Sequence, residues 1–353
     1  MMQITLHNGL IIAHIYNMKK EEIFLVTGAA GHLGYTIVSQ LVNDGKKVRA
    51  LVLPGDKLST RLPEKVDVCY GDVLDPDSLD RFFSIQEDTD IFVIHCAGIV
   101  TTSLKYQPMV YQVNVKGTQN MIDAALKHPV TKFVYVSSVH AIPELPKGQV
   151  IKEVDRFDKS LVYGMYSQTK AEATQCVLDA EQAGLDVTVV HPSGICGPNS
   201  HTLNYASQLV IECWEGSMPM GVEGGYDFVD VRDVSRGIIA SCRKGGKGQC
   251  YILANRFISI KEFFRTFQSI TGKKQPSVMA PMWVAKAALP FYSLYYKIKK
   301  QLPLFSSYSL YTLRSNALFS TDKARLELGY ATRPFQDTMF DTVTWLKNQK
   351  SIT

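Results

Sequence analysis

A glycine-rich turn between a predicted strand and a predicted helix constrains this chain more than any other stretch. Residues 23–26 are apolar and predict a buried parallel strand, and a helical pattern of apolar residues follows over 32–43. Gly28 lets the chain turn sharply, Gly31 lets a ligand approach the backbone, and Gly34 lets the helix pack closely on the strand. The helix N-terminus then offers free N–H groups and a positive dipole to phosphates. We therefore interpret the stretch as a pyrophosphate cradle rather than an ordinary turn.

The spacing G-x-x-G-x-x-G, with Thr27 ahead of it, resembles the short-chain dehydrogenase/reductase superfamily. Chain length and later motifs resemble its extended branch, which includes dihydroflavonol reductases, 3β-hydroxysteroid dehydrogenases and nucleotide-sugar epimerases. The resemblance covers residues 18 to about 349. It implies an α/β fold, a doubly wound parallel sheet of the Rossmann type with a smaller C-terminal substrate domain. It also implies that NAD(H) or NADP(H) contacts the turn at Gly28, Gly31, His32, Leu33 and Gly34.

Composition is that of an ordinary globular enzyme, with 353 residues, 46% hydrophobic and 20% charged. The net charge of +5 is mild, and no basic cluster with interleaved aromatics indicates a nucleic-acid partner. The cysteines are odd in number, scattered and without a C-x-x-C pair, which predicts reduced thiols, no metal site and a cytoplasmic location; they are Cys69, Cys96, Cys176, Cys196, Cys213, Cys242 and Cys250.

We expect three parts along the chain. Residues 1–17 lack the cationic segment of a signal peptide and the length of a membrane span, so they predict a disordered or mis-assigned leader. Residues 18–198 predict mainly the NAD(P)-binding domain, and residues 199–353 mainly the substrate domain. A stretch at about 226–255 is expected to return to the main domain, because 226–234 resembles the family's return segment.

Further strands are expected at 48–52, 66–70, 91–94, 133–136, 187–190 and 249–253, and helices at 162–184, 260–270 and 335–347. The resemblance implies a closing helix within 319–330 as well. Ser259 and Glu262 form the pattern of a capping box at the start of the second of these helices. Asp75 and Pro76 predict an N-cap followed by proline at the first helical position.

The preference between NAD and NADP stays open. Val52 and Leu53 occupy the end of the second strand, where the resemblance implies an acidic residue for NAD or an arginine for NADP. From the next loop, Asp56 could favour NAD, and Lys57 with Arg61 could favour NADP. Solvated loop charges are an equally good interpretation of all three.

Other cofactor contacts follow from the resemblance. Asp72 would bind the adenine amino group, with a turn-capping carboxylate as the alternative, and His95 would be structural. Asn114 would buttress the active site from a long helix, which is compatible with a buried amide satisfied by backbone. The remaining cofactor contacts implied are Val73, Ala97, Gly98, Lys170, Pro192 and Ser193.

The chemical centre is predicted at Tyr166 and Lys170, which are four residues apart and so share one helix face. We expect the Lys170 ammonium and the oxidised nicotinamide to lower the pKa of Tyr166, so that its phenol can exchange a proton with a substrate oxygen. Ser138 would hold that oxygen, and Ser137 is the less favoured alternative. Tyr163 is interpreted as a pocket wall.

Residues 281–313 are rich in aromatic and basic residues, and prolines at 290 and 303 are expected to break any apolar span. This segment is either a lid over an apolar substrate that also contacts a membrane surface, or ordinary packing of the small domain. Ser193 and Tyr226 stand where nucleotide-sugar enzymes of the family carry an asparagine and an arginine.

The resulting hypothesis is an NAD(P)-dependent oxidoreductase that interconverts a secondary alcohol and a ketone on an apolar or ring-containing small molecule. The resemblance also implies a homodimer. Two alternatives remain, a nucleotide-sugar epimerase or dehydratase and a non-catalytic NAD(P)-sensing module. Relatives of the last type typically lose the Tyr/Lys pair, which this chain keeps.

Overall fold

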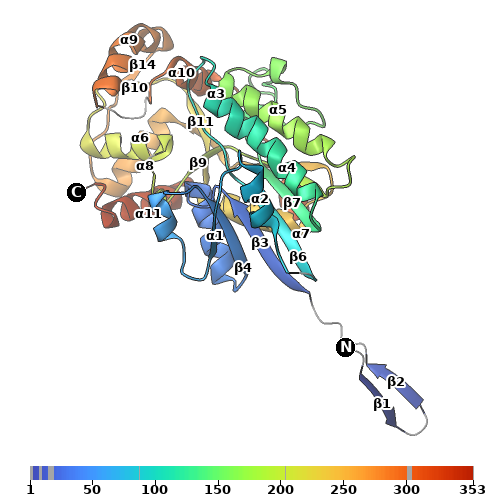
Figure 1. Ribbon diagram of the computed structural model, residues 1–353. Helices are drawn as coiled ribbons and strands as arrows, with labels where there is room; N and C mark the ends of the chain where they lie inside the picture. The colour runs from blue at the N-terminus through green and yellow to red at the C-terminus, as the bar shows by residue number, and fades with distance from the viewer. Residues whose placement is uncertain are drawn as a thin grey trace.

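A seven-stranded parallel sheet forms the centre of the computed structural model, which describes residues 3–7, 10–14, 20–86, 88–202, 204–299 and 304–352 (Figure 1). The strand order is β12-β8-β7-β6-β3-β4-β5. The strands are β3 (Glu21–Thr27), β4 (Lys47–Val52), β5 (Asp67–Tyr70), β6 (Thr89–His95), β7 (Val130–Val136), β8 (Val187–Pro192) and β12 (Gln249–Leu253). The sequences of the central strands are nearly continuous apolar runs, because helices cover the sheet on both faces.

Two hydrophobic clusters occupy the two faces of this sheet. Helices α2 (Pro76–Phe83), α4 (Thr118–Leu126) and α5 (Met165–Asp179) contribute to one of them. Helices α1 (His32–Asn43) and α7 (Val231–Lys244) contribute to the other. The fold class expected from the sequence, a doubly wound Rossmann sheet, is therefore confirmed.

Element boundaries differ from the sequence expectation mainly at α5. The expected helix began at residue 162, but α5 begins at Met165, because Gly164 adopts a φ of +95° that lies outside helical geometry. The helix also stops at Asp179, before the predicted end at 184. The expected N-cap at Asp75 is present, since its side chain accepts a hydrogen bond from the backbone of Asp77.

A smaller C-terminal part carries its own core. A three-stranded sheet joins β9 (Gly194–Cys196), β11 (Gly225–Asp230) and β13 (Arg256–Ser259), and β10 (Gly221–Val222) pairs with β14 (Met279–Ala280). Its helices are α6 (Tyr205–Glu215), α8 (Ile260–Thr271), α9 (Met282–Lys299), α10 (Ser307–Arg314) and α11 (Phe335–Asn348). The Ser259 side chain caps α8 as expected, accepting from Glu262. Shorter helical segments are α3 (Pro108–Tyr111), η1 (Lys57–Arg61), η2 (Gln112–Gly117), η3 (Val139–Ala141), η4 (Lys159–Leu161) and η5 (Ala324–Leu328).

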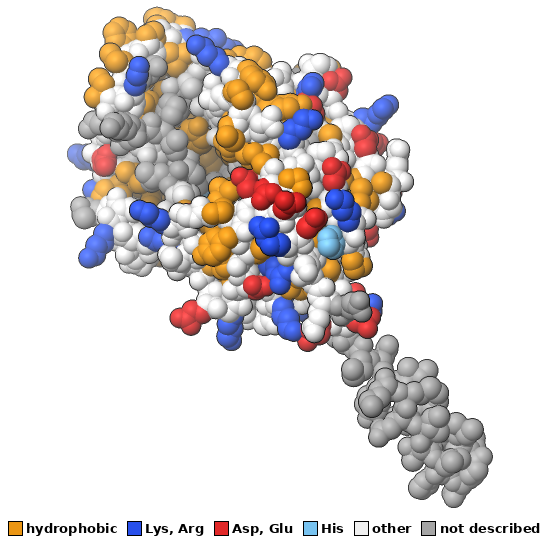
Figure 2. All heavy atoms as spheres, viewed as in Figure 1, with side chains coloured by type: hydrophobic (Ala, Val, Ile, Leu, Met, Phe, Trp, Pro, Cys, Tyr) orange, Lys and Arg blue, Asp and Glu red, His pale blue; other side chains and the backbone are white. Residues whose placement is uncertain are grey.

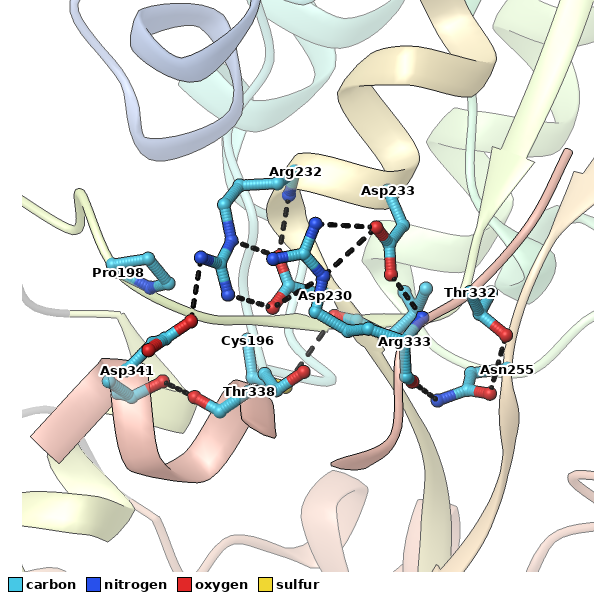
Figure 3. Close-up of polar contacts among 12 residues, drawn as sticks. Cys196, Pro198, Asp230, Arg232, Asp233, Asn255, Thr332, Arg333, Thr338 and Asp341 are labelled. Atoms are coloured by element: carbon cyan, nitrogen blue, oxygen red, sulfur yellow. Dashed lines mark hydrogen bonds and ion pairs between the residues drawn. The ribbon is translucent and has the colours of Figure 1, made fainter. Parts of the chain in front are cut away.

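A charge cluster connects the two parts where β11 runs into α7 (Figure 3). Arg232 pairs with Asp230 at 2.8 Å and with Asp341 of α11 at 2.7 Å, and Arg333 pairs with Asp233 at 2.9 Å. Burial disfavours the charge on Asp230, but the hydrogen bonds and charge of Arg232 outweigh it, so the pKa of this carboxyl is lowered. The cluster fixes α11 against the segment that returns to the main sheet.

Pro290 lies inside α9, which continues through it over eighteen residues, so this proline does not end the helix. Pro290 is exposed, so the backbone carbonyl that loses its partner can turn towards water. Pro303 lies outside the described residues. Across the described part of the chain, no helix is long and apolar enough to span a bilayer.

The predicted leader falls partly outside the described residues, which omit 1, 2, 8, 9 and 15–19. In its described part, β1 (Gln3–His7) pairs antiparallel with β2 (Leu10–His14). The division of the chain at residues 18 and 198 stays a prediction. All seven cysteines are described, and each is a free thiol.

Candidate active site

The turn between β3 and α1 brings backbone segments together more closely than side chains would allow. Gly28 has a φ of +64°, and a Cβ there would lie 2.8 Å from the Ala97 nitrogen. A Cβ on Gly34 would lie 2.1 Å from the Gly28 carbonyl oxygen. No side chain caps the N-terminus of α1, so its first N–H groups can bind phosphate oxygens. This cradle fits the pyrophosphate of a dinucleotide, and the contacts of Gly28, Gly31, His32, Leu33 and Gly34 with it stay a prediction.

His95 lies behind the turn as a structural residue. Its Nδ1 is 2.7 Å from Thr27 Oγ1, and its Nε2 is 3.0 Å from Thr118 Oγ1. The hydroxyl of Thr118 donates to the Asn114 carbonyl, so Nε2–H donates to Thr118 and Nδ1 accepts from Thr27. Burial lowers the pKa of His95 to about 3, which keeps the ring neutral. The Thr27 oxygen also accepts from the Ala97 amide, joining the ends of β3 and β6.

The His32 side chain connects the glycine turn to the small domain. Its Nε2 donates to the Pro198 carbonyl at 2.8 Å, and its Nδ1 accepts from the Asn204 amide at 2.9 Å. Asn204 also caps α6, because its side-chain oxygen accepts from Ser207. Burial lowers the pKa of His32 to about 4. The sequence assigned His32 only to the cofactor, and its side-chain contacts with Pro198 and Asn204 were missed.

At the adenine end, Asp72 accepts a hydrogen bond from Leu74 at 2.9 Å, so the turn-capping role is present and the adenine contact stays a prediction. Asp56 caps η1 through Leu58, and Arg61 lies 2.8 Å from His201. Two of the three loop charges therefore have partners within the protein, which leaves the choice between NAD and NADP open. A Cβ on Gly117 would lie 2.7 Å from the Val73 side chain, so the glycine leaves room for this valine.

Ser138 and Tyr166 face one cavity, whereas Ser137 does not. Ser137 is buried against Thr174, with 2.7 Å between the hydroxyl oxygens. Ser138 follows β7 and caps η3, and its side-chain oxygen accepts from the backbone N–H of His140. Burial raises the pKa of Tyr166 to about 12, although its hydrogen bond with Ser138 acts in the opposite direction. This geometry supports the preference for Ser138.

Lys170 donates from Nζ to the Val136 carbonyl at 2.7 Å and to the Tyr135 hydroxyl at 3.2 Å. Burial lowers its pKa to about 8. The expected lowering of the Tyr166 pKa by Lys170 is not found, because burial dominates and the ammonium points towards the end of β7. A Cβ on Gly98 would lie 3.6 Å from Lys170 Nζ, so Gly98 borders the lysine, and the cofactor contacts of Ala97 and Gly98 stay predictions.

Asn114 lies in the π-helical turn η2 and joins two parts of the site. Its amide nitrogen donates to the Ile99 carbonyl and to Thr169 of α5, and its oxygen accepts from the Ile99 amide at 2.7 Å. The amide is thus satisfied largely by backbone while it holds the strand end beside Gly98 against α5. Both interpretations made from the sequence describe this one arrangement.

On the opposite side, Pro192 ends β8, and Ser193 lines the cavity. Ser193 donates from Oγ to Asp227 at 2.5 Å, and burial raises the pKa of this carboxyl to about 6.

Tyr226 and His140 form a hydrogen bond of 2.7 Å between the tyrosine hydroxyl and His140 Nε2, and their rings stack 5.5 Å apart. Neither His140 nor Tyr308, whose hydroxyl is 2.9 Å from Ser167 Oγ, was predicted as a site residue. The position of His140 two residues after Ser138 was the available signal. Tyr163 lines a smaller neighbouring pocket of about 290 Å³.

The main cavity has a volume of about 520 Å³ and lies between the Rossmann sheet and the small domain. Its described wall contains no Lys, Arg, Asp or Glu. The apolar part of the wall consists of Val100, Ile195, Ala206, Leu209, Met218, Met220, Val222, Phe228, Ile260, Phe264, Leu304, Phe305 and Leu313. A cavity of this size and polarity accepts a small apolar molecule beside Tyr166.

Comparison with known proteins agrees with this geometry. The model of the NAD dependent epimerase/dehydratase family matches residues 24–254. A Synechocystis protein named as a candidate dihydroflavonol 4-reductase is 28% identical, covering 93% of this chain and 95% of the relative. Sterol demethylase protein B of Methylococcus capsulatus is 27% identical, covering 93% and 99%. The crystal structure of gox2253 has a TM-score of 0.78 at 29% identity, covering 94% and 99%.

The family match spans the glycine cradle, Tyr166, Lys170 and the strands that carry them. Relatives named for dehydrogenase and reductase activities extend over nearly the whole chain. The cofactor is accordingly a nicotinamide adenine dinucleotide, and the cradle described above would hold its pyrophosphate. The chain belongs to the NAD-dependent epimerase/dehydratase family and is an enzyme of the extended short-chain dehydrogenase/reductase type.

Proposed function

We propose that the protein is an NAD(P)-dependent oxidoreductase that interconverts a secondary alcohol and a ketone on an apolar or ring-containing substrate. The observation that carries this proposal is the uncharged wall of the cavity beside Tyr166, as far as the described residues form it. An apolar ring system gains about 25 cal/mol for each Å² that it buries there. A sugar diphosphate would bring charges that no described wall residue compensates, which is costly away from water.

The chemistry divides among three side chains. Tyr166 keeps its proton at neutral pH, because burial raises its pKa to about 12, and can donate it to a ketone oxygen. Ser138 holds that oxygen by a hydrogen bond and accepts from the His140 amide, which orients its hydroxyl. Lys170 contributes a positive charge and donors beside Gly98. The nicotinamide cofactor supplies or accepts the hydride when bound.

Two positions support an apolar substrate over a nucleotide sugar. Ser193 donates its hydroxyl to buried Asp227, and Tyr226 hydrogen-bonds His140, so neither offers a cation to a diphosphate. The names of relatives point the same way, since one is a 3-beta-hydroxysteroid dehydrogenase of Mycolicibacterium neoaurum that is 26% identical. The UDP-glucose 4-epimerase of Thermotoga maritima, at 19% identity and a TM-score of 0.74, shares the fold.

The test compares stabilisation of the cofactor complex by a ketosteroid and by UDP-glucose, measured as shifts in thermal unfolding. We expect stabilisation by the apolar ligand and little by UDP-glucose. A substrate panel of ketosteroids, dihydroflavonols, simple ketones and UDP-sugars, run with NADPH and with NADH, identifies the reaction and the cofactor. Tight UDP-glucose binding with no response to apolar ligands would establish the epimerase alternative. Cofactor binding without turnover of any class would favour the sensing module.

The proposal includes NADP as well as NAD, a homodimer and a cytoplasmic enzyme. The family resemblance supports the dimer, and the reduced cysteines support the compartment. Light scattering after size-exclusion chromatography tests the dimer, because the mass of one chain is 39.4 kDa.

A further inference from the structure

The outer face of α9 is apolar although it faces solvent. Trp283 is 73% exposed, Phe291 77% and Ile298 72%, and Leu294 is 59% exposed between the last two. The intervals of 8, 3 and 4 residues place these side chains on one side of a helix. Trp283, Phe291, Leu294 and Ile298 are hereafter the α9 stripe. Single exposed apolar residues are common, but a contiguous row of large ones marks an interaction surface.

The α9 stripe is separate from the core-facing side of the helix. Ala285 and Tyr296 are buried, and Ala285 joins a small cluster with Val222 and Leu310. The helix is thus already anchored to the small domain through its other face. The stripe therefore adds a second apolar face that folding of the described chain does not use.

The charged residues of α9 and of the sequence that flanks it have a single sign. From residue 263 to residue 321 the sequence contains eight Lys and Arg and no Asp or Glu. Lys286 and Lys297 are exposed and follow Trp283 and Leu294 by three residues, so they flank the stripe along one edge. Figure 2 shows hydrophobic side chains with Lys and Arg among them over the end of the molecule where Figure 1 places α9. An aromatic and aliphatic row with adjoining lysines matches an anionic lipid surface, where apolar side chains enter the interface and lysines meet headgroups.

We propose that α9 docks this enzyme on the surface of an anionic bilayer, with the helix lying in the interface. No described helix can cross a membrane, which agrees with a helix that lies on the surface. Leu304 and Phe305, which follow α9 in the chain, line the substrate cavity. Docking would thus bring the cavity wall near a phase in which apolar ketones concentrate. The docking itself does not depend on the proposed reaction.

The experiment is co-sedimentation of the full chain with phosphatidylcholine vesicles, with and without phosphatidylglycerol. We expect binding to the anionic vesicles that weakens as salt increases. The double variant Trp283→Ser/Phe291→Ser should lose about tenfold or more in vesicle affinity, because two large side chains no longer bury apolar surface. The variant Lys286→Gln/Lys297→Gln should weaken binding to anionic vesicles specifically.

The matched control is Leu326→Ser/Phe340→Ser, which removes two exposed apolar residues, 86% and 56% exposed, outside α9 and should bind as the wild type does. Unchanged cofactor affinity in each variant shows that the fold is intact. The proposal is overturned if the wild type ignores anionic vesicles, or if the α9 double variant binds them equally well. Loss of self-association in that variant, without any vesicle binding, would assign the stripe to contacts between copies. None of these outcomes depends on turnover, so failure of the oxidoreductase proposal remains distinguishable.

Discussion

The two sides of the substrate cleft are built on different principles. On the dinucleotide side, backbone segments touch, as the distance of 2.1 Å from a Gly34 Cβ to the Gly28 carbonyl illustrates. On the small-domain side, α10 and the segment before it contribute Leu304, Phe305 and Leu313 to a wall that needs only apolar side chains of suitable size. Close backbone contact permits one residue type at each position, whereas an apolar wall tolerates many. The dinucleotide side can therefore be recognised from a sequence motif, whereas the small-domain side is evident in the sequence only as an apolar composition.

The largest effect is expected on the dinucleotide side, for Tyr166→Phe. The substitution removes the hydroxyl that exchanges a proton with substrate while keeping the ring that lines the cavity. Turnover should fall by a factor of about 100 or more, the usual range for a lost acid–base group, and cofactor affinity should be kept. Steady-state kinetics and a cofactor titration measure the two quantities. Tyr163→Phe is the control, because Tyr163 is 47% exposed and lines the neighbouring pocket. Near-wild-type turnover of Tyr166→Phe on the true substrate would remove Tyr166 as the acid.

The next effect is expected for Lys170→Ala, which should damage cofactor affinity and turnover together. Lys170 is predicted to contact the nicotinamide ribose and borders Gly98, and its loss also leaves the Val136 carbonyl without its donor. Because burial lowers the pKa of Lys170 to about 8, the amine is charged below that pH and neutral above it. Turnover should accordingly decline as pH rises through about 8. A flat profile between pH 7 and 9, at saturating cofactor, would argue against a role for the charge.

The contrast between the two sides also explains what could be predicted from the sequence. The sheet, the glycine cradle and the Tyr166/Lys170 pair followed from patterns in which spacing fixes geometry, whereas the choice of Ser138 followed from the family resemblance. Tyr308 and the contacts of His32 could not be found, because they depend on segments far apart in the sequence meeting in space. His140 was missed although it follows Ser138 by two residues, and only its contact with Tyr226 depends on a distant segment. The pKa of Tyr166 was misjudged for a related reason, since burial is a property of the assembled cavity. The path of α9 through Pro290 shows that an exposed proline can be tolerated where sequence rules predict a break.

A smaller effect is expected where the two sides meet, for His32→Phe. The ring donates to Pro198 and accepts from Asn204, so its replacement leaves a carbonyl and an amide unpaired and should cost about 1–3 kcal/mol in the free energy of unfolding. Urea denaturation measures this loss. His128→Phe is the matched control, since His128 is partly buried and stacks on Phe83 rather than joining the two domains.

The pH dependence of stability separates this role of His32 from simple packing. The folded pKa of about 4 lies below the ordinary value of 6.5, so between these values the unfolded chain binds more protons and stability rises with pH. The contribution of His32 is complete above about pH 6.5 and is lost as pH falls towards 4. His32→Phe should therefore show a smaller rise in unfolding free energy across this window than the wild type. An identical rise in both proteins would contradict the neutral, hydrogen-bonded ring.

The smallest effect is expected outside both sides of the cleft, on deleting residues 1–17. The first strand of the main sheet begins at Glu21, and its pairing with β4 and β6 uses residues 21–27 only. Neither the sheet nor the cavity wall, as described, includes a residue before this strand. The truncated chain should therefore match the full chain in melting temperature and turnover. A folded truncation without activity would show that the segment contributes to the cleft, and the division of the chain at residue 18 would then be wrong.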